Sequence, residues 1–105
     1  MLRVVLCNCS PDESEQLARG LVEAGHAACV NILPGVVSCY EWEGEVCTET
    51  EHTLLIKTTD AGYPSMKEWI QEHHSYDVPE IVALEAVDVL DDYVEWVGRQ
   101  VKAAD

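Results

Sequence analysis

Three side chains far apart in the sequence, Cys7, His74 and Glu80, are the first candidates for metal chemistry. A thiolate and an imidazole are good ligands for copper, and a carboxylate can complete such a site. Cys9 follows two residues after Cys7, so an extended chain points both thiols to the same side, and two thiolates favour Cu(I). Structural roles stay open: Cys7 could pack in the core, and His74 could cap a helix end.

Lys57 interrupts an apolar segment, where its ammonium group must reach water or a carboxylate. One interpretation is an anion site in a cleft between subunits, shared with Tyr40, Trp42 and Glu80. The other is a structural ion pair with Glu80 or another acid. For Tyr40 and Trp42 themselves, packing between subunits is favoured over a ligand cage.

The other histidines and several polar residues favour structural roles. His73 falls on the apolar face of a predicted helix, where a hydrogen-bonded core histidine is more common than a ligand. We expect His26 and His52 at the surface, and Cys29 buried within a strand. Asn31, close to a predicted turn, is expected to satisfy backbone groups.

The motifs typical of enzymes are missing from this sequence. It holds no phosphate-binding loop, nucleotide fingerprint or catalytic triad. A cysteine and a histidine could act as nucleophile and base, but no third residue that would orient them can be identified. We therefore expect no enzymatic activity.

Composition narrows the class further. The 105 residues suit one domain spanning 1–105, and six basic against twenty acidic residues give a formal net charge of −14. Such a surface repels nucleic acid. No apolar run reaches the roughly 20 residues that span a bilayer, and no signal-peptide cleavage pattern is found, so we expect a cytoplasmic protein. Five cysteines without a Cys-x-x-Cys motif argue against a disulfide framework.

The first half of the chain predicts two strands around a helix, followed by a long hairpin. Residues 2–7 form an apolar strand, and Ser10 with Glu13 predicts a capping box that opens a helix ending at Gly25. The apolar residues 27–33 form a strand that a Pro34-Gly35 turn is expected to stop. A strand over 36–42 is expected to turn tightly into 45–48, and the chain then runs extended through 49–51 into 52–59. This pattern predicts a long, bent hairpin with a protruding tip.

The second half predicts a helix, a strand and a terminal helix. Pro64 opens the helix, whose buried stripe comprises Met66, Trp69, Ile70 and His73. A strand follows over 80–87, and apolar spacing over 90–101 marks the last helix. The order β-α-β-β-α-β with an added helix is that of a ferredoxin-like α+β sandwich. One sheet face then lacks a helical cover, which favours oligomerisation.

Five collinear stretches together resemble the CutA (divalent-cation-tolerance) family. They are Ala27–Gly35, Tyr40–Gly44, Leu55–Thr59, His74–Ile81 and Asp92–Trp96. The resemblance implies a ferredoxin-like subunit, a tight homotrimer built by the long hairpins, and an association with copper and other divalent cations. It also implies structural kinship with PII signalling proteins, which bind small effectors between subunits.

The resemblance bears on the candidate residues as well. Family members are proposed to use a cysteine near the first strand and the histidine of a His-x-Tyr-x-x-Pro-Glu motif, and these positions match Cys7 and His74. Ser75 stands where the family commonly has proline. We therefore expect a trimeric copper-binding or divalent-cation-binding protein involved in metal tolerance. The alternative is a PII-like sensor of small molecules, or a scaffold, without a metal function.

Overall fold

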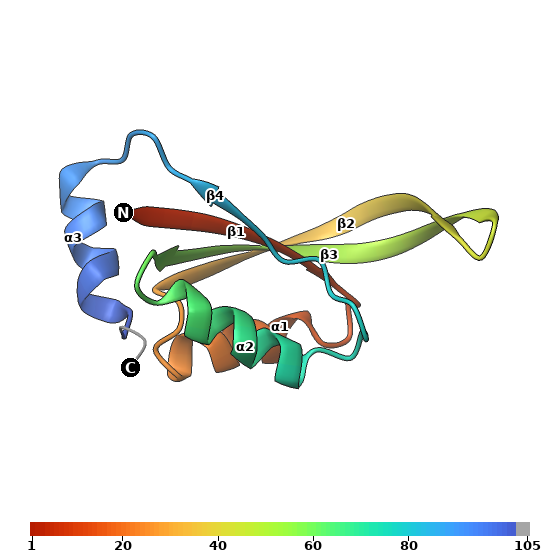
Figure 1. Cartoon of the computed structure of the whole chain (residues 1–105), viewed down its shortest axis with the longest axis horizontal. Coiled ribbons are helices and arrows are strands. Elements are labelled where there is room, and N and C mark those ends of the chain that lie inside the picture. Colours follow the sequence, from red (N-terminus) through yellow and green to blue (C-terminus); the bar gives the residue numbers. More distant parts are fainter. Residues whose placement is uncertain (103–105) are drawn as a thin grey trace.

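The computed structural model describes residues 1–102, so that 103–105, the end of the predicted domain, lie outside the described residues. Four strands and three helices occur in the described part of the chain (Figure 1). Their order is β1 (Leu2–Cys9), α1 (Ser14–Glu23), β2 (Cys29–Trp42), β3 (Glu45–Thr59), α2 (Tyr63–His73), β4 (Val82–Glu85) and α3 (Asp91–Gln100). The predicted β-α-β-β-α-β order with an added helix is confirmed.

The four strands form one antiparallel sheet in the order β2-β3-β1-β4. β1 lies inside the sheet with a partner on each side, as its apolar sequence predicts. β4 is an edge strand of only four residues, shorter than the predicted 80–87. No helix within residues 1–102 is long and apolar enough to cross a membrane.

Helices α1 and α2 lie together on one side of the sheet and enclose the main core (Figure 1). Alternate residues of β1 and β3 point into this core, and the helices supply the other half. The largest fully buried apolar side chains there are Val5, Leu21, Leu54, Ile56, Met66 and Ile70. A smaller cluster around Leu2, Ala28 and Val97 attaches α3 to the end of the sheet.

The opposite face of the sheet, called the open face below, is covered only at one end, where α3 packs against Val4. Alternation along the strands places Leu6, Leu33, Leu55 and Leu84 on this face, away from α1 and α2. Leu33 is 39% exposed and Leu84 is 49% exposed, although both are large apolar residues. Away from α3, the open face of this chain alone is therefore an exposed apolar surface.

The β2–β3 hairpin projects beyond the helices and lengthens the molecule to 45 Å, against 27 and 21 Å in the other directions (Figure 1). The prediction that a turn at Pro34-Gly35 ends the strand is wrong. β2 continues through it, because β3 offers an unbroken partner and the ladder absorbs the extra residues as a bulge between Leu33 and Val36. At the tip, Glu43 and Gly44 both have positive φ, as a two-residue type I′ turn requires.

The start of α1 differs from the sequence prediction, whereas the start of α2 agrees with it. α1 begins at Ser14 rather than directly after Ser10, and the predicted capping box is absent. The Ser10 hydroxyl instead donates to the Glu13 carboxylate at 3.0 Å. α2 carries Pro64 in its first turn as predicted, but His73 on its expected buried stripe is exposed.

Candidate functional site

Polar groups, both side-chain and backbone, gather from four segments where β1 ends, α1 begins and the loop after α2 crosses the sheet. The residues that meet there are Asn8, Glu13, Glu51, His74, Ser75 and Tyr76. The chain brings them together because β1, β3 and the 74–80 loop all pass this end of the core. Cys7 and Cys9 lie beneath them on the core face of β1.

His74 lies at the centre of this cluster and is 8% exposed. Its Nε2 atom is 2.9 Å from the Asn8 carbonyl oxygen, and the Tyr76 backbone N–H donates to Nδ1 at 3.0 Å. Because Nδ1 accepts a hydrogen bond, the ring proton belongs on Nε2, which donates to Asn8. Both ring nitrogens therefore already have backbone partners.

Cys7 and His74 share one hydrogen-bond acceptor, the carbonyl oxygen of Asn8. The Cys7 thiol donates to the Asn8 carbonyl oxygen at 3.8 Å, so the structure brings these two predicted site residues close together. Cys7 is fully buried. Burial, and then the nearby Cys9 thiol and the carboxylate of Glu80, raise the pKa of Cys7 to about 12. Burial likewise raises the pKa of Cys9 to about 11.

As arranged, these residues do not form a metal centre. The Cys7 thiol is protonated at neutral pH, and His74 has no lone pair to offer while it bonds Asn8 and Tyr76. Glu80 is exposed, and its contribution at Cys7 is an electrostatic one. Within residues 1–102, no group of three or more His, Cys, Asp or Glu side chains could hold a metal ion. The assignment of Cys7, His74 and Glu80 as ligands stays a prediction.

The sequence analysis missed two carboxylates that organise this cluster. Glu51 is 6% exposed and accepts a hydrogen bond from the Tyr76 hydroxyl at 2.8 Å. Glu13 accepts the Ser75 backbone N–H at 3.2 Å and the Ser75 hydroxyl at 2.5 Å. Burial opposes ionisation of Glu13, but the bonds from Ser75 and Ser10 outweigh it and lower its pKa. The sequence marked Glu13 only as part of a predicted capping box, and nothing in the local pattern distinguishes Glu51 among twenty acidic residues.

Ser75 uses its backbone N–H in this contact, which a proline could not do. The departure from the family pattern noted above therefore gives this chain a bond between the 74–80 loop and the start of α1. His52, expected as an isolated surface residue, is half-buried, and its Nδ1 lies 2.8 Å from the Ser14 hydroxyl. His26 is also half-buried, beside Trp69.

Lys57 lies in another region, on the open face of the sheet. It donates to the side-chain oxygen of Asn31 and, at 3.4 Å, to the Leu55 carbonyl oxygen. The predicted ion pair with Glu80 is not among the salt bridges of the described residues. Asn31 thus serves a side chain rather than the backbone groups expected.

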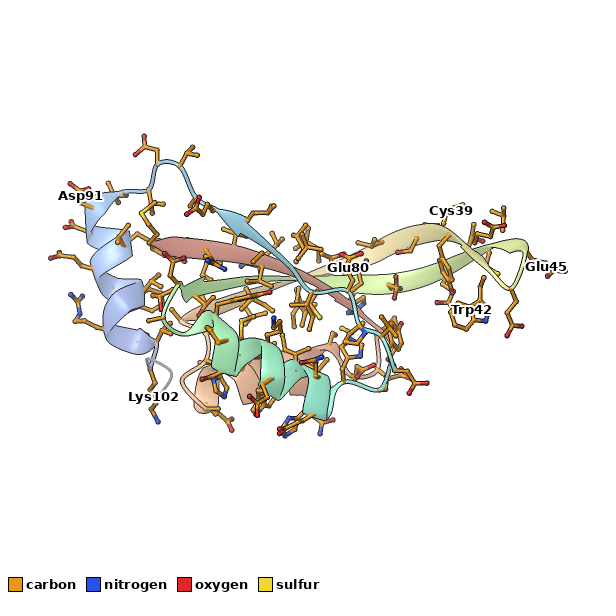
Figure 2. The ribbon with its side chains drawn as sticks, viewed as in Figure 1. Cys39, Trp42, Glu45, Glu80, Asp91 and Lys102 are labelled. Atoms are coloured by element: carbon orange, nitrogen blue, oxygen red, sulfur yellow. The ribbon has the colours of Figure 1, made fainter. Side chains whose placement is uncertain are left out.

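Tyr40 and Trp42 are far from Lys57 within one chain. Lys57 pairs with Cys29 in the sheet, whereas Tyr40 pairs with Cys47, ten residues further up β3. Ten strand residues span roughly 33 Å. Figure 2 shows Trp42 at the hairpin tip near Cys39 and Glu45, well separated from Glu80. A cleft that combines Lys57, Tyr40 and Trp42 cannot form inside a single subunit.

The fold and these sites define a class: a ferredoxin-like subunit with an open sheet face and a projecting hairpin. The family model described as CutA1 divalent ion tolerance protein matches residues 3–100. The divalent-cation tolerance protein CutA of Thermus thermophilus is 44% identical over 98 residues, which cover 92% of this chain and 95% of that protein. The chloroplastic protein CutA of Arabidopsis thaliana is 42% identical over 91 residues, or 87% of this chain and 50% of that protein.

Solved structures agree with this result. The Cut A1 protein of Thermus thermophilus superposes with a TM-score of 0.93 at 42% identity, covering 97% of this chain and 100% of that chain. A PII-like protein CutA from Nostoc in apo form gives a TM-score of 0.92 at 38% identity, over 97% and 99%. This chain belongs to the CutA1 divalent ion tolerance family. It spans nearly all of the Thermus relative but about half the length of the plant one.

Proposed function

We propose that this chain assembles into a homotrimer that acts in the response to divalent cations as a PII-like regulatory module. The observation that carries the proposal is the open sheet face with its exposed apolar residues, continued by Trp42 at 65% exposure on the hairpin. Exposed apolar surface of this extent is typical of protein interfaces. The number of three subunits follows from the family resemblance. No catalysed reaction is part of the proposal, and the cytoplasmic location stays a prediction.

The molar mass in solution tests the assembly, measured by size-exclusion chromatography with light scattering. Two valines of equal exposure, 44% each, provide a matched pair: Val82 on the open face and Val22 on α1. We expect a mass three times that of the chain for wild type and Val22→Asp, and a monomer for Val82→Asp. A monomeric wild-type protein would contradict the assembly. If both variants dissociated equally, the open face would not be the interface of the trimer.

The position of Lys57 supports effector binding between subunits. Its ammonium group lies on an apolar face, bonded to Asn31 and a backbone carbonyl, where a neighbouring subunit would enclose it. A cation enclosed in this way attracts a small anion. We expect a thermal-shift screen of cellular anions to identify stabilising compounds whose effect is lost in Lys57→Met. A flat response across the panel would leave the trimer without this role.

Direct binding of copper or another divalent cation is the second candidate. Support comes from the family's association with divalent ions and from the contact of Cys7 and His74 with one carbonyl oxygen. Binding would require the Cys7 thiol to lose its proton and one ring nitrogen of His74 to leave its backbone partner. Because the thiol must ionise, the affinity should rise with pH. Calorimetric titration of the reduced protein with Cu(I) and Cu(II), beside Cys7→Ala/His74→Ala, tests it. Binding that survives both substitutions would reject this site.

A further inference from the structure

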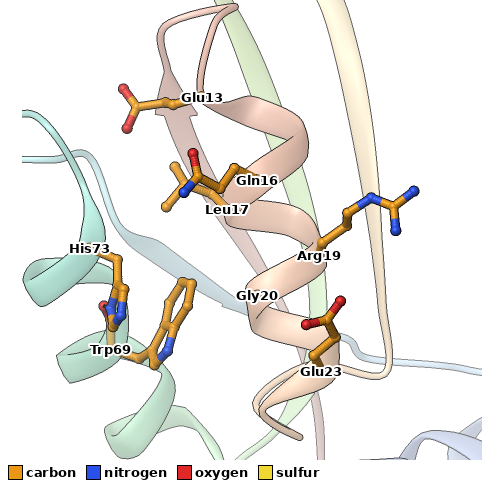
Figure 3. Close-up of a pocket in the computed structure, with 8 residues that line it drawn as sticks. All are labelled: Glu13, Gln16, Leu17, Arg19, Gly20, Glu23, Trp69 and His73. Atoms are coloured by element: carbon orange, nitrogen blue, oxygen red, sulfur yellow. Dashed lines mark hydrogen bonds between the residues drawn. The ribbon is translucent and has the colours of Figure 1, made fainter.

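A groove of about 390 Å³ separates α1 from α2 on the outer surface of the helix layer (Figure 3). Its α1 wall includes Glu13, Gln16 and Glu23, and its α2 wall is formed by Trp69 and His73. The groove lies across the helix layer from the open sheet face. It therefore remains accessible whether or not that face is covered by other subunits.

An aromatic pair forms one wall of the groove. The imidazole of His73 stacks on Trp69 with ring centroids 4.0 Å apart and an interplanar angle of 14°. The Nδ1 atom of His73 lies 2.8 Å from the Trp69 carbonyl oxygen, which holds the imidazole in this orientation. Because His73 is exposed, its stacked ring offers a flat, fixed surface to solvent.

The close approach of the two helices keeps this wall in place. A Cβ atom at Gly20 would lie 2.6 Å from the Trp69 ring, so only glycine allows the indole to pack against α1. Trp69 is also 6.1 Å from His26, ring centroid to centroid. The indole therefore has little freedom, and the groove is formed before any ligand binds.

The charge of the groove favours a cation. Glu13 and Glu23 line it, and a second hollow that Trp69 also lines adds Glu68 and Glu72. Arg19 is the one arginine or lysine among these lining residues, and it is paired with Glu15 at 3.4 Å. Figure 3 shows the Arg19 side chain pointing away from the aromatic pair.

We propose that this groove binds an arginine side chain from a basic segment of a partner protein. A guanidinium group is planar, stacks on aromatic rings and donates several hydrogen bonds to carboxylates at once. The groove offers both a stacked aromatic surface and carboxylates. Lysine matches the charge but not the flat shape, so arginine is the preferred side chain. The volume suits one such side chain and its neighbours.

The test is an NMR titration of the full chain with a five-residue peptide of alternating arginine and alanine. We expect saturable shifts at the Trp69 indole and at amides of α1 and α2. The lysine–alanine peptide should bind several-fold more weakly, and a glutamate–alanine peptide should cause no shift. Equal affinity for the lysine peptide would overturn the proposal.

Two charge-neutralising variants separate a site from general attraction to an acidic protein. Glu23→Gln removes a carboxylate from the groove, whereas Glu95→Gln makes the same change on α3. We expect several-fold weaker arginine-peptide binding for Glu23→Gln and His73→Ala, with little change for Glu95→Gln. An equal loss from both glutamate variants would mean that net charge alone attracts the peptide, and the groove would not be a site.

Discussion

His74 is held at both ring nitrogens by backbone groups, so its first role in this structure is to tie the 74–80 loop to β1. Removing the ring leaves the Asn8 carbonyl and the Tyr76 N–H without these partners in a mostly buried place. We predict that His74→Ala lowers the free energy of unfolding by about 1–3 kcal/mol. Urea denaturation at fixed protein concentration measures this. Unchanged stability would mean that the two hydrogen bonds contribute little.

The buried Cys7 thiol makes stability depend on pH in the alkaline range. Its pKa is raised from 9.0 to about 12 on folding, so the folded state holds a proton that the unfolded chain releases first. The resulting stabilisation is fully present below pH 9 and is lost as pH rises toward 12. We predict a fall in unfolding free energy of up to about 1.4 kcal/mol per pH unit from this group. Cys7→Ala should show a smaller fall over the same range.

The contact between α1 and α2 depends on one small residue. Gly20→Ala would place a Cβ atom 2.6 Å from the Trp69 ring, whereas Gly98→Ala on α3 meets nothing within 4 Å. Both glycines lie inside helices, where alanine is intrinsically favoured by up to about 1 kcal/mol. We predict that Gly20→Ala destabilises the protein by about 1–3 kcal/mol because it forces the helices apart. Gly98→Ala should be neutral or stabilising in the same thermal or urea denaturation.

The bulge in β2 shows that pairing with a neighbouring strand decides where a strand ends. Pro34 and Gly35 are turn residues, and Gly35 has the φ of +71° that a turn would use. Yet the register on β3 resumes at Val36 opposite Glu51, so the hairpin continues through the bulge. The bend changes the direction of the hairpin without ending it. It thereby carries Tyr40 and Trp42 far from the core of their own subunit.

Charge acts on the whole molecule. The formal net charge of −14 per chain means that its acidic side chains repel one another, and this repulsion grows when subunits assemble. We predict that raising NaCl from about 20 mM to about 500 mM increases the thermal unfolding midpoint, because the Debye length shrinks below the spacing between subunit charges. MgCl₂ at the same ionic strength is the control for specific divalent binding. A midpoint that falls with NaCl would contradict the prediction.

Much of the fold could be predicted from the sequence alone. The alternation of apolar residues along strands and their spacing along helices indicate which face of each segment is buried. These patterns predicted the order of the elements and the partly uncovered sheet. The same pattern left core packing of Cys7 open beside a ligand role, and the structure buries the residue. The family resemblance was carried by stretches that lie in order along nearly the whole chain, and the match over residues 3–100 bears it out.

The tertiary structure alone decided which atoms meet at the candidate sites. His74 bonds a carbonyl 66 residues away, and Ser75 bonds Glu13 across 62 residues. His73 is exposed because Trp69 takes the space beside Gly20 and the imidazole stacks outside it. Local periodicity cannot report such pairings, since each depends on how separate segments pack. The sequence by itself therefore determined the family and the order of the strands and helices. Packing of these elements decided which donors, acceptors and surfaces come together.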